Sequence, residues 1–173
     1  APKARSLLEG VHKKLGMTPT LMRPMANSPA VLDAYLAFSG SLGRSRLSAK
    51  LREQIALTVG ELNRCRYCLA AHTALARSAG LSDEEIADGR HGTATDRRAE
   101  AVLQLARKIV EERGWVSDDD LAAARGAGLG DAEIVEVVAV VALNLFTNYI
   151  NHVAGTEVDF PEVAPPPAQA SLH

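Results

Sequence analysis

Four side chains near the middle of the chain form the set best able to do chemistry: Glu53, Cys65, Cys68 and His72. Two thiols separated by two residues, with an imidazole four positions further on, can carry out reversible two-electron redox chemistry. On an α-helix, at about 100° per residue, Cys65, Cys68 and His72 fall within an arc of about 60°. We therefore expect three reactive groups on one helix face, with the Glu53 carboxylate reaching that face from the preceding segment.

The start of a helix is a favourable place for a reactive thiol. A thiol is a poor nucleophile until it loses its proton, and the unpaired N–H groups of a first helical turn stabilise an anion there. We expect Cys65 to begin the helix and Cys68 to lie within its first turn. His72, one turn later, can accept a proton near Cys68. Glu53 can hold the imidazole in one tautomer or take the proton through water.

A pair of cysteines at this spacing suits peroxide chemistry. A thiolate that attacks a peroxide oxygen becomes a sulfenic acid. The neighbouring cysteine can then condense with the sulfenic acid to form a disulfide, because cysteines on adjacent turns approach closely without a change of fold. The residues themselves thus supply a nucleophile, a resolving thiol and a proton path.

Two other uses of the same residues remain open. Cys65, Cys68 and His72 could bind zinc, with Glu53 as the fourth ligand. Their spacing spreads the donors along about 10 Å of helix axis, so a tetrahedral site would be strained. The cysteines could also be inert packing residues. The pattern favours redox chemistry over both.

The motif resembles that of a known family. Glu53, eleven residues, Cys65, two residues, Cys68, three residues and His72 are similar to the signature of the alkylhydroperoxidase AhpD-like proteins of the carboxymuconolactone decarboxylase superfamily. The run CRYCLAAH at 65–72 is similar to the version found in the peroxidase-related branch. The ending NLFTNYINHV at 144–153, followed by DFP at 159–161, also resembles that branch.

The resemblance implies an all-α, multi-helical domain with a central helical hairpin that carries the CxxC motif, assembled into homotrimers or homohexamers. It implies a thiol-dependent hydroperoxide reductase in which Cys68 attacks the substrate and Cys65 resolves it. Glu53 and His72 would form the relay that deprotonates Cys68. The best-studied members carry a second histidine where this chain has Tyr67. A phenol is a poor base near neutral pH, so we expect a shorter or water-mediated relay.

The last predicted helix offers further polar side chains to the site. His152, with Asn148 and Asn151, could line the same cavity, because polar groups in an otherwise apolar helix need partners when they are buried. Tyr67 should lie near the site, since the two cysteines flank it. Glu61 is expected to be a solvated residue at a helix end.

Composition narrows the class of protein. The 173 residues suit one domain, and 47% hydrophobic content with only 4% aromatic residues favours close-packed helices over a β-sandwich. The net charge of −2, with charges of both signs spread along the chain, gives no case for a nucleic-acid partner. No secretory segment is evident, and the apolar run 134–146 is too short for a bilayer. We expect a cytoplasmic protein with no membrane partner.

The breakers and caps divide the chain into three parts. Residues 1–27 should be irregular or form short helices, 28–154 should form the helical domain, and the Pro-rich tail 155–173 should be extended or disordered. Helix start and stop signals predict helices at 29–42, 48–62, 65–78, from 82, 95–114, from 117, and 131–152. The last of these is nearly apolar on all sides from 134 to 146, so we expect subunits to pack together there.

The leading expectation is an antioxidant enzyme that reduces hydroperoxides with the Cys65–Cys68 pair and an external thiol or dithiol donor. No flavin, haem or nucleotide motif is visible, so no cofactor is expected. One alternative is decarboxylation of a small lactone acid, although relatives thought to do this lack the cysteine pair. Another is a redox-responsive assembly protein without catalysis.

Overall fold

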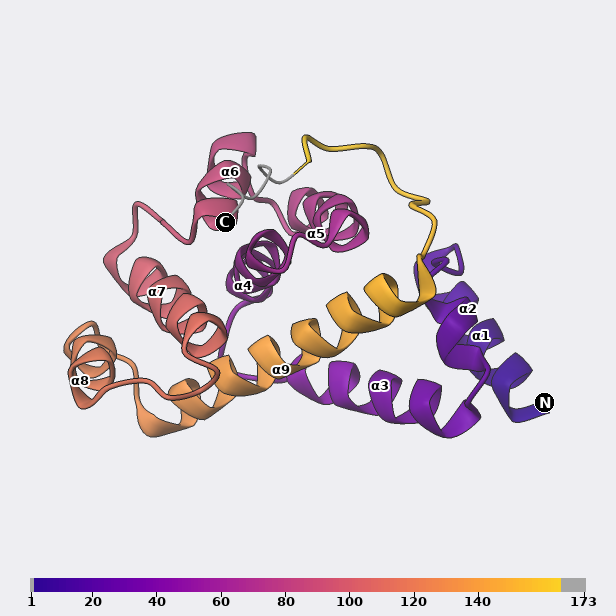
Figure 1. Cartoon of the computed structure of the whole chain (residues 1–173), viewed down its shortest axis with the longest axis horizontal. Coiled ribbons are helices and arrows are strands. Elements are labelled where there is room, and N and C mark those ends of the chain that lie inside the picture. The colour runs from indigo at the N-terminus through magenta and orange to yellow at the C-terminus, as the bar shows by residue number, and fades with distance from the viewer. Residues whose placement is uncertain (1, 166–173) are drawn as a thin grey trace, which may run out of the picture.

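A computed structural model of the chain describes residues 2–165, and every regular element in that range is an α-helix (Figure 1). The predicted all-α fold is therefore confirmed. The last eight residues of the predicted Pro-rich tail, 166–173, lie outside the described residues. In chain order the helices are α1 (Pro2–Leu15), α2 (Met22–Ala26), α3 (Pro29–Leu42), α4 (Ala49–Leu62), α5 (Arg66–Ser78), α6 (Asp83–His91), α7 (Arg97–Glu111), α8 (Asp118–Gly126) and α9 (Asp131–Ala154).

Helix α4 is the centre of the molecule. It packs against α5, α6, α7 and α9, and its residues Ile55, Leu57 and Val59 are completely buried. The chain then reverses through Asn63 and Arg64, where Arg64 adopts a left-handed backbone with φ 56°. This sharp turn sets α5 beside α4 (Figure 1). The two helices form the central hairpin that carries the CxxC motif, as the sequence predicts.

Side-chain caps explain where most of these helices begin. Ser48, Ser82, Asp96 and Ser117 each accept the backbone N–H of the residue three positions on. Such a cap satisfies a backbone donor that has no partner inside the helix. The sequence also predicts Asp131 as the cap of the last helix, whereas in the structure Gly130 is the cap residue and Asp131 is the first helical residue.

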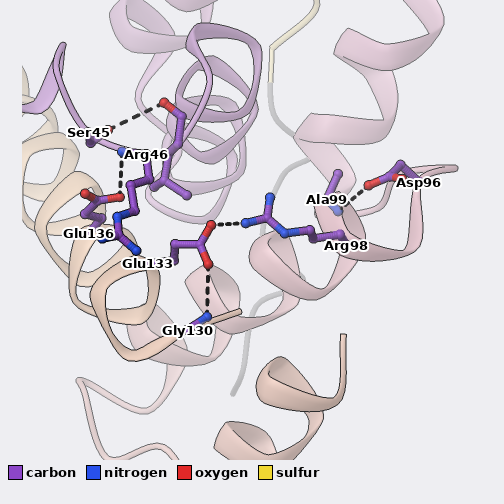
Figure 2. Close-up of polar contacts among 9 residues, drawn as sticks. Ser45, Arg46, Asp96, Arg98, Ala99, Gly130, Glu133 and Glu136 are labelled. Atoms are coloured by element: carbon purple, nitrogen blue, oxygen red, sulfur yellow. Dashed lines mark hydrogen bonds and ion pairs between the residues drawn. The ribbon is translucent and has the colours of Figure 1, made fainter. Parts of the chain in front are cut away.

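Two glutamates anchor the first turns of α9. Figure 2 shows the Glu133 carboxylate between two partners, the backbone N–H of Gly130 at 2.9 Å and the guanidinium of Arg98 on α7. These contacts, the Gly130 hydrogen bond foremost, lower the pKa of Glu133. One turn later, Glu136 accepts the backbone N–H of Arg46, between α3 and α4, at 2.9 Å. The N-terminal end of α9 is thereby fixed to the rest of the bundle.

From that anchored end, α9 runs across the molecule past α3, α4 and α5 (Figure 1). Among the described helices, α9 has the length and apolar composition that a membrane span needs, and the core helix of a folded domain meets the same test. Its side chains Val137, Val140 and Val141 are buried in the core shared with α4 and α7.

Segments at both ends of the chain close around α5. In the N-terminal part, where the sequence indicated only short helical segments, α1 extends over 14 residues, because the breakers begin only at Gly16. At the other end, the tail leaves α9 and passes α5 toward α6 (Figure 1). The guanidinium of Arg90 on α6 donates to the carbonyl oxygen of Ala164 at 3.0 Å, and Val163 packs beside the buried Leu69.

Candidate active site

The two cysteines occupy the start of α5. Cys65 is the cap residue, and its Sγ accepts the backbone N–H of Cys68 at 3.3 Å. A disulfide joins Cys65 and Cys68 across a Cα–Cα distance of 5.2 Å. The sulfur pair is thus in its oxidised form, at the helix start that the sequence predicts. Within residues 2–165, no three His, Cys, Asp or Glu side chains gather as metal ligands would.

The predicted acid and imidazole meet across the central hairpin. Glu53 Oε2, from α4, lies 2.7 Å from Nδ1 of His72 on α5, and each side chain is about one-fifth exposed. An ionised carboxylate can only accept, so this contact places the proton of a neutral imidazole on Nδ1 and leaves Nε2 as a free acceptor. His72 follows Cys68 by one helical turn, so both side chains share one face.

Helix α9 brings two amides to the sulfur of Cys68. Asn148 Nδ2 lies 3.0 Å from Cys68 Sγ, and Asn151 Nδ2 lies 3.3 Å from the same atom. Asn148 is completely buried, and Asn151 is 5% exposed. Nδ2 of Asn63, at the end of α4, donates to Asn148 Oδ1 at 2.9 Å. The structure therefore places Asn148 and Asn151 at the site.

His152 does not join them. The structure leaves its side chain exposed, and it lines none of the cavities beside Cys68 in a single chain. One residue along a helix turns the side chain by about 100°, so the residue after Asn151 points away from the sulfurs. The expectation that His152 lines the cavity is corrected accordingly.

A mostly apolar cavity of about 190 Å³ opens beside Cys68. Its polar contributions come from a few side chains, among them His72, Thr147 and Asn151, and none of the described residues that line it is Lys or Arg. A larger depression of about 940 Å³ lies between α1 and α2, without either cysteine. The cavity at Cys68 is lined by Leu15, Met17, Pro19, Leu21, Met22, Tyr35, Tyr67, Cys68, Ala71, His72, Leu75, Thr147, Asn151 and Phe160.

Tyr67 holds the two end segments over this cavity. Its hydroxyl accepts the backbone N–H of Leu21 at 3.2 Å, and its ring meets Phe160 edge to face at 5.8 Å. The Asp159 carboxylate accepts the backbone N–H of Thr20 at 2.7 Å, which links the two end segments directly. Burial, followed by the nearby Asp159, raises the pKa of Tyr67. Tyr67 therefore stays neutral at physiological pH and acts here as an anchor.

Glu61 also differs from expectation. It forms an ion pair with Arg90 at 2.7 Å, and both side chains are about 15% exposed. The end of α4 is covered by α6, which the sequence around Glu61 does not reveal. Glu61 is thus a structural residue, as expected of a residue outside the site, but it is mostly buried instead of solvated.

Sequence reasoning missed the cavity walls that come from the N-terminal segment. Leu21 and Met22 are nearly buried beside the cysteines, yet they follow Pro19 in a stretch with no periodic pattern. Phe160 lies in the DFP run that contributes to the family resemblance. That run indicates the branch of the family, but it does not indicate that Phe160 lies at the cavity. Only the tertiary contacts identify these walls.

Taken together, the all-helical fold and the cysteine hairpin define an AhpD-like domain. Residues 29–112, just under half of the chain, match the model described as the carboxymuconolactone decarboxylase family, so the resemblance is confirmed for that segment. No curated protein sequence matches the chain.

Solved structures share this fold over most of its length. An uncharacterised peroxidase-related protein from Silicibacter sp. TM1040 is 26% identical, with a TM-score of 0.81 over 91% of this chain and 85% of that one. A peroxidase-related protein from Ralstonia eutropha JMP134, described as an alkylhydroperoxidase AhpD core, is 22% identical, with a TM-score of 0.83 over 92% and 86%. A debrominase in complex with 2,3,4-tribromopyrrole is 15% identical, with a TM-score of 0.77 over 92% and 87%.

Proposed function

We propose that this protein is a thiol-dependent peroxidase that reduces a compact organic hydroperoxide. The observation that carries the proposal is the position of Cys68. Its side chain lines an apolar cavity together with His72, while its bonded partner Cys65 lies outside the residues that line that cavity. The sulfur that a substrate can reach is therefore that of Cys68, which lies one helical turn before His72, and this favours Cys68 as the attacking thiol.

The reaction begins from the reduced pair. His72 Nε2 takes the proton of the Cys68 thiol, and the thiolate attacks the terminal oxygen of the hydroperoxide. The O–O bond breaks, the alcohol leaves with the proton returned by His72, and Cys68 becomes a sulfenic acid. The Cys65 thiol then attacks the Cys68 sulfur, which releases water and forms the disulfide. An external dithiol supplies two electrons and two protons to restore the thiols.

The walls of the cavity support an apolar substrate. Alkyl or aromatic groups gain free energy when they leave water for such a surface, at about 25 cal/mol per Å². A lactone acid carries carboxylates that need cationic partners when they are buried, and the described lining residues include neither Lys nor Arg. The cavity thus favours hydroperoxide reduction over the decarboxylase alternative.

Assembly of identical subunits belongs to the same proposal. One stripe of α9 remains uncovered, with Val135, Val138, Tyr149 and Val153 exposed by 46% or more. These residues follow a spacing close to that of a helix–helix seam. Because the opposite face of the same helix holds the two asparagines, a second copy packed on the stripe would also support the site. Light scattering of Val138→Glu should then report a smaller particle than the unchanged protein.

The decisive test uses the two cysteines separately. After reduction and one equivalent of cumene hydroperoxide, the unchanged protein should lose two titratable thiols and two hydrogens of mass. Cys65→Ser should instead gain one oxygen as a trapped Cys68 sulfenic acid, and the double variant with both cysteines changed to serine should gain none.

Turnover distinguishes the proposal from its rivals. Cys68→Ser should abolish peroxide-dependent oxidation of an added dithiol, since the attacking sulfur is gone. Full turnover in that variant would contradict the assigned roles. If peroxide turnover were absent while the disulfide changed the particle size, the redox-responsive assembly protein would replace the enzyme.

A further inference from the structure

We infer that Asn148 and Asn151 form a donor pair that stabilises the Cys68 thiolate, and that Asn63 orients the first of the two amides. This inference rests on the proposed function for its catalytic meaning, although the geometry behind it stands by itself. Two amide nitrogens approach Cys68 Sγ, at 3.0 Å from Asn148 and 3.3 Å from Asn151. Both come from α9, outside the segment that matches the family model.

Cys68 needs donors of this kind because of where it lies. Its side chain is 3% exposed beside an apolar cavity, and burial of that kind disfavours a thiolate. The backbone N–H of Cys68 donates to the sulfur of Cys65. Tyr67 is held neutral between the cysteines and accepts from Leu21. The two amides of α9 supply the hydrogen-bond donors to Cys68 that these neighbours do not.

The orientation of the Asn148 amide follows from its other contact. Asn63 Nδ2 donates to Asn148 Oδ1 at 2.9 Å, so the NH₂ group of Asn148 is the end that faces Cys68. A carbonyl oxygen at that position would repel a sulfur anion, whereas an amide NH₂ donates to it. Asn63 caps the end of α4, and so the turn that builds the hairpin also fixes this donor.

The side-chain oxygen of Asn151 is available for a second contact. Its Nδ2 faces Cys68, but its buried Oδ1 has no hydrogen-bond partner among residues 2–165. Buried acceptors are normally satisfied. Asn151 also lines the substrate cavity. We assign this oxygen to the O–H group of the bound hydroperoxide, which would hold the peroxide beside the attacking sulfur.

The first test measures the thiol pKa without any peroxide. In a Cys65→Ser background, the pH dependence of iodoacetamide alkylation reports the pKa of Cys68. Asn148→Leu should raise that pKa by about one to two units, because a hydrogen bond to a charged group is lost. Asn63→Leu should raise it less, since the Asn148 amide remains but is no longer oriented.

Asn144→Leu is the matched control. Asn144 lies one turn before Asn148 on α9 and is also buried, with 5% of its surface exposed, but its amide donates to the carbonyl of Val140. That variant should leave the Cys68 pKa unchanged. An unchanged pKa in both Asn148→Leu and Asn63→Leu would overturn the donor pair. If Asn148→Leu does not fold, as judged by circular dichroism, the partly buried Asn63→Leu decides the matter.

The second test separates the two asparagines. With both cysteines present, Asn151→Leu should raise KM for cumene hydroperoxide about tenfold, while Asn148→Leu should lower kcat with little change in KM. Equal KM values in the two variants would refute the contact to Oδ1. A shifted thiol pKa without any peroxide turnover would support the donor pair and reject the proposed function, so the two failures are distinguishable.

Discussion

The two sides of the Cys65–Cys68 pair are built by different parts of the chain. On one side, Glu53 and His72 lie 19 residues apart and belong to the two helices of the central hairpin. On the other, Asn148 reaches Cys68 across 80 residues, and Leu21 reaches Tyr67 across 46. The groups suited to moving a proton are thus local in sequence, whereas the surroundings of the sulfur depend on packing between distant segments.

The family match falls on the part of the chain that holds the local groups. The family match covers 29–112, which includes the hairpin but neither α9 nor the segments over the cavity. Substrate selection and thiol activation would then change by substitutions outside the motif.

The largest effect is expected on the local side. His72→Gln should lower kcat/KM for a hydroperoxide by about a hundredfold or more, in the range that general acid–base catalysis contributes. Glu53→Gln should lower kcat/KM less, because the side-chain oxygen of glutamine can still accept a hydrogen bond from Nδ1–H of His72. Steady-state turnover with a dithiol donor measures both.

Glu61→Gln provides the control for the local side. Glu61 also forms an ion pair from α4, but with Arg90 and away from the sulfurs. Its substitution should lower the thermal midpoint and leave kcat/KM unchanged. If His72→Gln retained full activity, the proton would have to travel by a route that avoids the hairpin.

The same contrast decides what the sequence could predict. The spacing of Cys65, Cys68 and His72 predicted their common helix face, because helix periodicity alone brings such residues together. Glu53 reaches His72 only because a short turn folds α5 back against α4. Helix starts were predictable for a similar reason, since a capping serine acts within three residues of its partner. Local rules sufficed for both.

The features of the site that depend on long-range packing could not be predicted from the sequence. An asparagine in an apolar helix signals a buried partner, but it does not say which partner, and the sequence could not exclude His152 one position further on. Glu61 was expected in solvent because nothing near it indicates that α6 covers the end of α4. Leu21 and Met22 follow a proline in a stretch without periodicity, so their position at the cavity could not be predicted from the sequence.

A smaller effect is expected from the distant side, in substrate choice. Phe160→Ala should enlarge the cavity and shift the ratio of kcat/KM for cumene hydroperoxide over tert-butyl hydroperoxide about tenfold, which is typical of a change in an apolar pocket. Phe38→Ala, on α3 and 39% exposed outside the cavity, is the matched control. A ratio that moves equally in both variants would mean that Phe160 does not limit substrate size.

The smallest effect concerns Tyr67, which joins the local motif to the distant segments. Tyr67→Phe should lower the free energy of unfolding at pH 8 by about 1 kcal/mol, through loss of the hydrogen bond from Leu21. Burial, then Asp159, raises the pKa of Tyr67 in the folded state above its ordinary value of 10.0. Above pH 10 the unfolded chain therefore releases a proton that the folded chain retains, and stability must fall as pH rises.

Phenylalanine has no such proton, so the two stability curves should converge above pH 10. Urea unfolding from pH 8 to 11 measures this, with Tyr35→Phe as a comparison because burial also raises the pKa of Tyr35. The backbone N–H of Leu21 donates to Tyr67 and not to Tyr35, so Tyr35→Phe should flatten the alkaline slope without the loss of that hydrogen bond at pH 8. Parallel curves for Tyr67→Phe and the unchanged protein would show that Tyr67 is already solvated, and that the end segments are not held over the cavity by this residue.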